Sequence, residues 1–307
     1  MNFVPKGIVL PVVTPTDEQG VFSPGRYRQL LRYWMDHGVH GVFPFGTTGE
    51  FYAFEEDVLR RMIDISLEEG RGGLTVYAGA NHISPNKVLK LARLAEMAGA
   101  HALSVLTPMF VSQSQDELYH YYKTISEGTP LPIVIYDNKG KTNVHVMPET
   151  VARLAEFQNI VALKDSTGDL ANTGECIRLT RHRGDFHVLM GRDTHILAGL
   201  HYGCAGAITS CGNIAPGIAV DIYSHFLEGR MAQALEAQFL LSQLRLATGM
   251  GSFPVVIKEG LRLIGLDAGD CQAPILPLTP PQRDQLKAVL TDIGLMTPLL
   301  AGLAGRS

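Results

Sequence analysis

Eight short runs rich in β-branched and other apolar residues recur along this chain and most strongly limit how it folds. They cover residues 7–13, 40–45, 74–79, 102–106, 132–136, 160–164, 186–190 and 205–209. Between them lie amphipathic stretches in which apolar residues are spaced by three and four, as in Tyr27, Leu30, Leu31 and Trp34. Strand-like runs that alternate with helices at intervals of about 20 to 30 residues are typical of repeated βα units. The pattern therefore predicts an α/β protein with a closed (β/α)8 barrel, the TIM barrel.

After the eighth run the alternation ends, and helical patterns cover residues 214–227, 230–247, 253–264 and 281–293. The first of these would be the eighth barrel helix, so the remaining helices form a C-terminal helical appendage. We expect a barrel with the active site in residues 1–228 and a C-terminal helical domain in residues 229–307. No low-complexity linker separates the two parts, so the appendage is expected to pack on the barrel.

Composition narrows the class of partner. The 307 residues carry a formal net charge of -4, so the chain offers no basic field for a nucleic acid, and we expect a small-molecule partner. The chain start lacks the pattern of a signal peptide, and no apolar stretch approaches membrane-spanning length. We therefore expect a cytoplasmic protein with no membrane partner.

The four cysteines show no Cys-x-x-Cys spacing and are expected to be buried apolar residues, not disulfides or metal ligands.

One lysine occupies an unusual position at the end of a predicted strand. Lys164 follows four apolar residues, 160–163, and precedes Asp165. An amine that attacks a ketone needs a partly desolvated place that disfavours its ammonium form, and a strand end offers one. The alternative is an ordinary salt bridge between Lys164 and Asp165 or another carboxylate. In a barrel the active site lies at the carboxyl ends of the strands, where Lys164 is predicted to be.

Two further strand ends carry polar groups. Strand five ends at Tyr136, and strand two is followed by Gly46, Thr47 and Thr48, whose backbone N–H groups and hydroxyls suit a carboxylate. Taken singly, Tyr136 could be a rim tyrosine, and the loop could be an ordinary turn with a threonine cap. Taken together with Lys164, they supply what imine chemistry on a 2-oxo acid requires. That chemistry uses the cationic imine nitrogen to withdraw electrons, so no metal or cofactor is expected.

These motifs resemble those of the dihydrodipicolinate synthase and N-acetylneuraminate lyase family of class I aldolases. The resemblance runs from residues 11–16 through 46–50, Tyr136 and 163–168 to the helical tail. It implies a barrel with a C-terminal helical domain, usually assembled as a homotetramer. It also implies that Lys164 forms an imine with pyruvate or a related 2-oxo acid and that Tyr136 shuttles protons. Thr47 and Thr48 would bind the carboxylate, and Thr47 would take part in the proton relay.

The chain departs from the synthases of that family at two places. Phe110 stands where their second tyrosine enters the proton relay of a neighbouring subunit, and a phenyl ring relays no proton. Lys141 stands where they carry an arginine that grips a dicarboxylate, and lysine keeps the charge without the bidentate fork. The expected substrate-binding residues are Gly46, Thr48, Phe110, Lys141 and Ile208.

These departures favour a Schiff-base lyase, an aldolase or dehydratase, acting on pyruvate, a 2-keto-3-deoxy sugar acid or a related 2-oxo acid. The alternative is 4-hydroxy-tetrahydrodipicolinate synthase activity, the condensation of pyruvate with aspartate semialdehyde. A second alternative is a barrel that binds 2-oxo acids without catalysis. Residues 191–193 and 206–213 follow strands seven and eight, where many barrels bind phosphate, so a phosphorylated substrate is also open. The glycines there could instead give backbone clearance beside the ketone.

Overall fold

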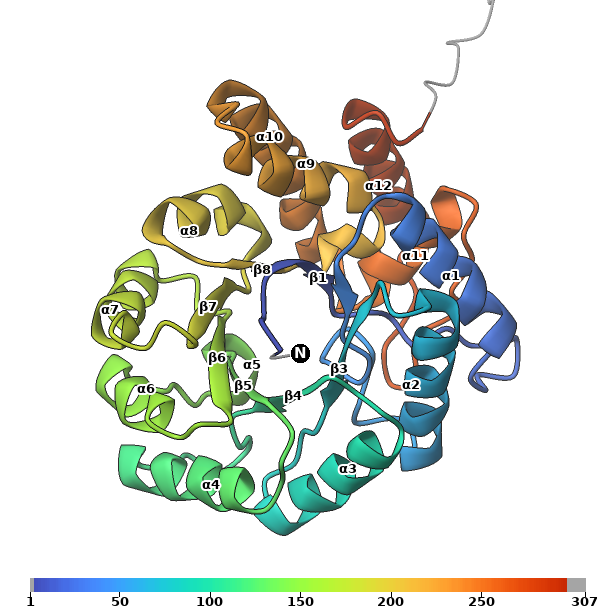
Figure 1. Cartoon of the computed structure of the whole chain (residues 1–307). Coiled ribbons are helices and arrows are strands. Elements are labelled where there is room, and N and C mark those ends of the chain that lie inside the picture. Colours follow the sequence, from blue (N-terminus) through green and yellow to red (C-terminus); the bar gives the residue numbers. More distant parts are fainter. Residues whose placement is uncertain (1–2, 297–307) are drawn as a thin grey trace, which may run out of the picture.

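A computed structural model describes residues 3–296 of the chain. Eight parallel strands close into a barrel in the order of the sequence, and helices surround it (Figure 1). The strands are β1 (Gly7–Leu10), β2 (Gly41–Val42), β3 (Thr75–Gly79), β4 (Ala102–Leu106), β5 (Ile133–Asp137), β6 (Ile160–Asp165), β7 (His187–Met190) and β8 (Gly206–Ile208). The predicted (β/α)8 barrel is therefore confirmed.

The helices of the barrel follow the strands in turn. They are α1 (Pro24–Asp36), α2 (Glu56–Gly70), α3 (Pro85–Met97), α4 (Gln115–Glu127), α5 (Lys139–Thr142), α6 (Pro148–Ala155), α7 (Leu170–Thr180), α8 (Ile196–Tyr202) and α9 (Pro216–Leu227). Short 3₁₀ turns, η1 (Asp193–His195) and η2 (Cys211–Asn213), follow β7 and β8. The sequence explains the starts: the Ser23 hydroxyl accepts a hydrogen bond from the N–H of Arg26, and Pro24 occupies the first turn of α1.

Some predicted bounds differ from the observed ones. The second strand was expected over residues 40–45, but β2 is only Gly41–Val42. Phe45 has a φ of 60°, a left-handed conformation that no strand contains, and Pro44 has no N–H to donate to a neighbouring strand. The chain therefore leaves the sheet early and turns over the end of the barrel. The four-residue helix α5, after β5, was not predicted.

Side chains alternate between two cores along the strands. Residues that point into the barrel, such as Val134, Tyr136 and Ala162, form one buried cluster. Residues on the other face, such as Ile135 and Leu163, pack against the surrounding helices in the larger cluster. Because the strand period is two, Lys164 shares the inward face with Ala162.

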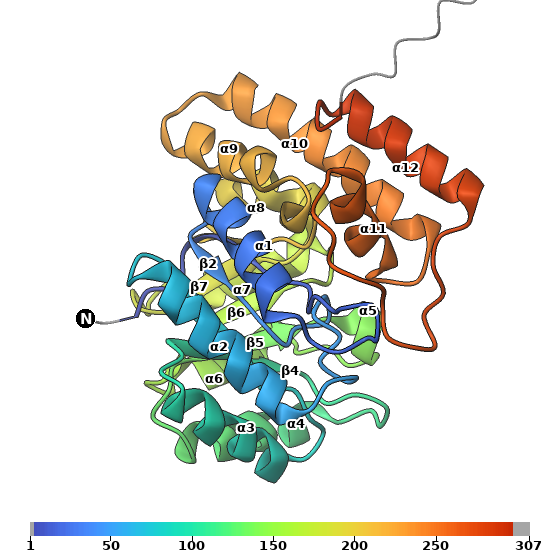
Figure 2. The same cartoon turned by 90° about the vertical axis from the view of Figure 1, so that its right-hand side faces the viewer.

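Beyond the barrel the chain forms α10 (Met231–Ala247), η3 (Thr248–Met250), α11 (Val255–Leu263) and α12 (Pro280–Asp292). Helix α10 packs on α9, and α12 packs on α10 and α11. Figure 2 shows the N-terminal segment on one side of the barrel and α5 and α11 on the opposite side. The division into residues 1–228 and 229–307 stays a prediction, and residues 297–307 lie outside the described part.

Within residues 3–296, no single helix is long and apolar enough to cross a membrane. The segments Met231–Met250 and Val255–Leu263 pass that test only as a pair, and they meet at a bend of 120°.

Candidate active site

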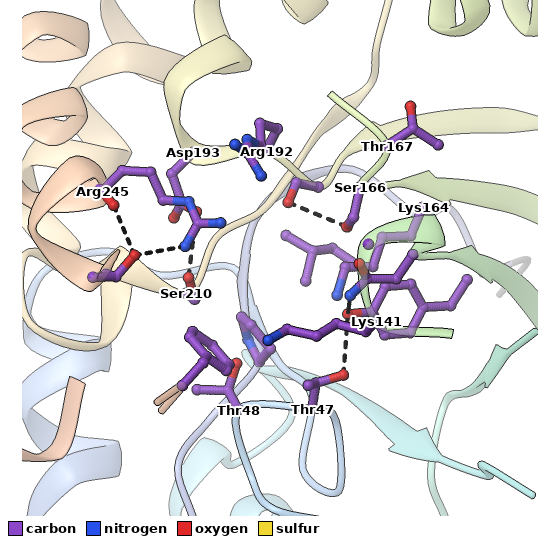
Figure 3. A pocket seen from close by; sticks show the side chains of 18 of the residues that line it. Thr47, Thr48, Lys141, Lys164, Ser166, Thr167, Arg192, Asp193, Ser210 and Arg245 are labelled. Carbon is purple, nitrogen blue, oxygen red and sulfur yellow. Dashed lines mark hydrogen bonds and ion pairs between the residues drawn. The ribbon is translucent and has the colours of Figure 1, made fainter. Parts of the chain in front are cut away.

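A cavity of about 460 Å³ opens at the carboxyl ends of the strands (Figure 3). Its walls come from the barrel loops and from the segment around the end of α10. The lining residues are Pro11, Thr47, Thr48, Tyr136, Asn138, Gly140, Lys141, Lys164, Ser166, Thr167, Gly191, Arg192, Asp193, Ile208, Ser210, Arg245, Thr248, Gly249, Gly251, Ser252 and Phe253. A site of this kind joins residues that are distant in the sequence.

Lys164 lies at the end of β6 with only 2% of its surface exposed. Its Nζ is 3.6 Å from the centroid of the Tyr136 ring and 5.1 Å from that of Phe43. Burial lowers the pKa of Lys164 below its ordinary value, and it outweighs the opposing attraction of Tyr136 and Asp193. The neutral, nucleophilic amine is therefore more populated here than on a protein surface.

Asp165 does not pair with Lys164, so that form of the salt-bridge alternative is wrong. The Asp165 side chain points to the other face of the strand, where its carboxylate accepts hydrogen bonds from the N–H and hydroxyl of Thr167 at 2.9 and 2.6 Å. It also accepts from the Thr173 hydroxyl at 2.8 Å. These bonds fix the turn after β6 and leave Lys164 free of its sequence neighbour.

Tyr136 is the partner of Lys164 across adjacent strands, since the two residues pair in register between β5 and β6. The phenolic oxygen lies 3.3 Å from the Thr47 hydroxyl and accepts a hydrogen bond from Asn138 Nδ2 at 2.9 Å. Burial alone would raise the pKa of Tyr136, but the charge of Lys164 and these hydrogen bonds together lower it. A phenol with a lowered pKa is a better proton donor.

The loop that carries Thr47 and Thr48 is tightly held. Glu50, at its end, adopts a φ of 52° and is fully buried. The Thr14 hydroxyl donates to the carbonyl of Gly49 at 2.7 Å, which fixes the loop from β1. Thr47 and Thr48 line the cavity, whereas Gly46 is buried and is not among the lining residues, so its role in substrate binding stays a prediction.

The other residues predicted to bind substrate divide into two groups. Lys141, on α5, and Ile208, at the end of β8, both line the cavity. Lys141 Nζ lies 5.5 Å from the centroid of the Phe253 ring. Phe110 is not brought to the cavity: its side chain is 93% exposed and its φ is 77°. The loop after β4 turns its ring away from this chain's own cavity, and the prediction that Phe110 binds substrate stays a prediction.

Several residues at the cavity were not chosen from the sequence as site residues. Arg192, Asp193 and Ser210 lie just after β7 and β8, in the segments 191–193 and 206–213, which the sequence indicated only for a phosphorylated substrate or for backbone clearance. Arg245 comes from α10, where helical spacing gives no sign that it faces the active site. Only the packing of α10 against the barrel reveals it.

The arrangement offers a buried amine, a phenol beside it and a hydroxyl-rich loop within hydrogen-bonding distance of the phenol. In the part of the chain that the structure describes, no group of three or more His, Cys, Asp or Glu side chains is placed to hold a metal ion. The expectation that no metal or cofactor takes part stays a prediction.

Comparisons with known proteins agree over almost the whole chain. The model of the dihydrodipicolinate synthetase family matches residues 4–293. The chain is 34% identical to the 4-hydroxy-tetrahydrodipicolinate synthase of Thermotoga neapolitana, covering 95% of this chain and 99% of that protein. It is also 34% identical to the synthase of Rhodospirillum centenum, with the same coverage of 95% and 99%.

Solved structures give the same result. The dihydrodipicolinate synthase of Thermotoga maritima superposes with a TM-score of 0.92 at 33% identity, covering 95% of this chain and 99% of that one. A prophage protein of the same family from E. coli K12, solved in complex with pyruvate, superposes with a TM-score of 0.90 at 26% identity, covering 95% and 99%. Agreement of sequence and fold over the full length shows that this chain belongs to the dihydrodipicolinate synthetase family, whose members are class I aldolase-type lyases.

Proposed function

We propose that this protein is a 4-hydroxy-tetrahydrodipicolinate synthase, which condenses pyruvate with aspartate semialdehyde through an imine on Lys164. The observation that carries the proposal is the pairing of a buried amine, Lys164, with a phenol, Tyr136, inside a cavity with further cationic side chains. The names of the full-length relatives favour this reaction over the sugar-acid chemistry that the sequence first suggested.

The first half of the proposed reaction forms the imine. Pyruvate binds with its carboxylate on the Thr47–Thr48 loop, and the neutral amine of Lys164 attacks the ketone carbon. The resulting carbinolamine loses its hydroxyl as water when Tyr136 supplies a proton to the leaving oxygen. Thr47, at 3.3 Å from the phenolic oxygen, is placed to pass a proton to or from Tyr136.

The second half uses the imine to form a carbon–carbon bond. The cationic nitrogen draws electrons, so the methyl group of the bound pyruvate loses a proton to the phenolate that Tyr136 became in the first half, and an enamine forms beside a regenerated phenol. The enamine carbon attacks the aldehyde carbon, and the aldehyde oxygen takes a proton, for which Tyr136 is the nearest donor. Attack on the imine carbon by an amine or by water then releases Lys164 as the free amine.

Lys141 is the residue that we expect to meet the carboxylate of the second substrate first, as that substrate enters the cavity. It lines the cavity and is exposed, so it can meet an incoming acid without the cost of burying an unpaired charge. Lysine provides one point charge where a guanidinium would provide a fork, so its grip on the carboxylate is less directional.

A second candidate is the aldolase or dehydratase reaction on 2-keto-3-deoxy sugar acids. The observation in its favour is a row of hydroxyl side chains along the cavity, from Ser166, Thr167 and Ser210, which suit sugar hydroxyls. A third candidate is a protein that binds 2-oxo acids without catalysis. A measurement of turnover distinguishes it from both enzymes.

The test begins with borohydride reduction in the presence of pyruvate, followed by intact mass measurement and peptide mapping. A reduced adduct on Lys164 is expected, and Lys164→Ala should lose it while keeping the native circular dichroism spectrum. Absence of the adduct in the unmodified protein would contradict the imine proposal.

Turnover assays then separate the three candidates. Consumption of pyruvate that depends on aspartate semialdehyde supports the synthase. Pyruvate release from 2-keto-3-deoxy acids would support the second candidate, and an adduct without turnover would support the third.

We also propose that the protein assembles as a homotetramer, as the family resemblance implies. Exposed apolar side chains support an assembly: Phe110 is 93% and Val111 56% exposed in the loop after β4. Phe239 and Leu246 on α10 are 54% and 77% exposed. Sedimentation velocity should show one tetrameric species, and a monomer at micromolar concentration would contradict the proposal.

A further inference from the structure

We propose that Arg192 and Arg245 form a second anion-binding subsite, which receives a carboxylate or phosphate at the end of the substrate remote from its 2-oxo acid group. The inference rests on the proposed function, because it takes the 2-oxo acid to be bound at Lys164. It adds the class of substrate: an acid with a second oxyanion.

The charges that line the cavity do not balance. Lys141, Lys164, Arg192 and Arg245 are basic, and Asp193 is the acidic side chain among the lining residues. One carboxylate of a 2-oxo acid at the Thr47–Thr48 loop reduces the excess and still leaves it positive. A second anion would be attracted to the part of the cavity where the remaining positive charge is concentrated.

Asp193 does not neutralise both arginines, because its carboxylate is already engaged. The side chain is 2% exposed and accepts hydrogen bonds from the hydroxyl of Thr209 at 2.5 Å and from the N–H of Cys211 at 2.9 Å. It also accepts from Ser210 at 3.3 Å. Its ion pair with Arg245 is longer, at 3.5 Å. The main role of Asp193 is thus to hold the turn after β8.

Arg192 has no such partner. Its side chain is half-buried in the cavity wall, and within residues 3–296 it makes no hydrogen bond or ion pair. Burial and the neighbouring charge of Arg245 lower its pKa. An oxyanion in the cavity would give this guanidinium the hydrogen-bond acceptors that no protein group within residues 3–296 supplies.

Arg245 is held in a position to share that anion. Its Nη1 donates to the hydroxyl of Thr248 at 2.8 Å, and this hydroxyl donates to the carbonyl of Arg245 at 2.7 Å. Figure 3 shows Arg192 and Arg245 on either side of Asp193, away from Thr47 and Thr48. A substrate that reaches both places must therefore carry an anionic group at each end.

The test compares dianionic with monoanionic 2-oxo acids by borohydride trapping on Lys164. The probes are 2-oxoglutarate, 2-oxoadipate and 2-oxopimelate, each set against the 2-oxo monocarboxylate of the same chain length. For the dianion whose length fits, we expect half-maximal trapping at a concentration about tenfold lower than for its monoanion. A parallel pair, 2-keto-3-deoxygluconate and its 6-phosphate, tells whether phosphate is preferred to carboxylate.

The variants assign the preference to these arginines. Arg192→Gln should bring the ratio of the two half-maximal concentrations close to one, and Arg245→Lys should reduce it in part. The matched control is Arg181→Gln, which removes one positive charge from an exposed position outside the cavity. It should leave the ratio unchanged.

Three outcomes would overturn the inference: equal trapping of every pair by the unmodified protein, a preference that survives Arg192→Gln, or a preference lost equally in Arg181→Gln. Failure of the proposed function looks different, because then pyruvate itself leaves no adduct. In that case calorimetric titration with the same acids decides the matter. Tighter binding of the dianion that is lost in Arg192→Gln supports the subsite, and equal binding refutes it.

Discussion

Lys164 carries an amine at a place that water barely reaches. Its surface is 2% exposed, and its nearest polar partner is a phenol instead of a carboxylate. A buried carboxylate beside it would stabilise the ammonium form and remove the nucleophile. The neighbourhood of Tyr136 instead lets a proton be exchanged between the two groups. This environment is the one that the proposed imine chemistry requires of Lys164.

The lowered pKa of Lys164 leads to a prediction about pH. The rate of adduct trapping with pyruvate should rise with pH as the amine loses its proton, and it should fall again where the Tyr136 phenol ionises. Because burial lowers the pKa, the midpoint should lie below the ordinary lysine value of 10.5. The measurement is the initial trapping rate across a pH series, and a midpoint at or above 10.5 would contradict the burial argument.

Tyr136→Phe gives a second prediction at this scale. The phenyl ring keeps the packing but loses the proton donor, so adduct formation should slow by about 10² to 10⁴-fold. The phenol also raises the pKa of Lys164, so its loss should move the midpoint of the pH profile to lower pH. Thr47→Val, which removes the neighbouring hydroxyl, should slow the reaction less. An unchanged rate in Tyr136→Phe would show that another group moves the proton.

Among the elements, the loop after β2 is held by contacts from outside the barrel. Glu50 Oε1 pairs with Lys258 Nζ of α11 at 2.8 Å, and both side chains are buried. Glu50 Oε2 accepts a hydrogen bond from the N–H of Gln272 at 2.7 Å, and Lys258 also donates to the carbonyl of Asp270 at 2.8 Å. The C-terminal segment thereby fixes the end of the loop that carries Thr47 and Thr48.

Lys258→Met should therefore be strongly destabilising, because it leaves the Glu50 carboxylate buried without its counter-charge. We expect a loss of about 3 kcal/mol in the free energy of unfolding, measured by urea denaturation. Replacing both partners, Glu50→Gln with Lys258→Met, should recover part of this loss. The control is Arg60→Met, which breaks the exposed pair with Asp64 and should cost less than about 1 kcal/mol. Equal effects of Lys258→Met and Arg60→Met would refute the argument.

At the scale of the whole molecule, closure of the barrel depends on the seam between its first and last strands. Gly206 of β8 pairs with Gly7 of β1. A Cβ atom on Gly206 would lie 2.1 Å from the carbonyl oxygen of Gly7, which is part of the backbone and cannot give way easily. The two strands approach this closely because glycine stands at the contact.

Gly206→Ala should open this seam and destabilise the protein by about 3 kcal/mol, at the upper end for an overpacked site. The control is Gly184→Ala, since a Cβ there would meet nothing within 4 Å. Thermal unfolding followed by circular dichroism compares the two variants, and similar melting temperatures would contradict the prediction.

The sequence by itself determined the barrel and the position along it of the residues that we propose to be reactive. Apolar runs alternate with amphipathic stretches along the chain. Few arrangements bury both the apolar strands and the apolar faces of the helices, so the pattern predicts eight βα units. Lys164, Tyr136 and Thr47 could be chosen because each stands where a predicted strand ends. The barrel brings the carboxyl ends of all its strands to one face. The end of each strand can be predicted from the local sequence, so these residues could be chosen without the structure.

The tertiary structure alone decided which other residues share the cavity. Phe110 could not be placed from the sequence, because a φ of 77° in the loop after β4 turns it away. Arg245 and Lys258 lie on helices whose patterns mark only a buried face. Their partners, Asp193 and Glu50, are far away along the chain. Such contacts depend on how the C-terminal helices pack on the barrel, and the local spacing of residues does not encode that packing.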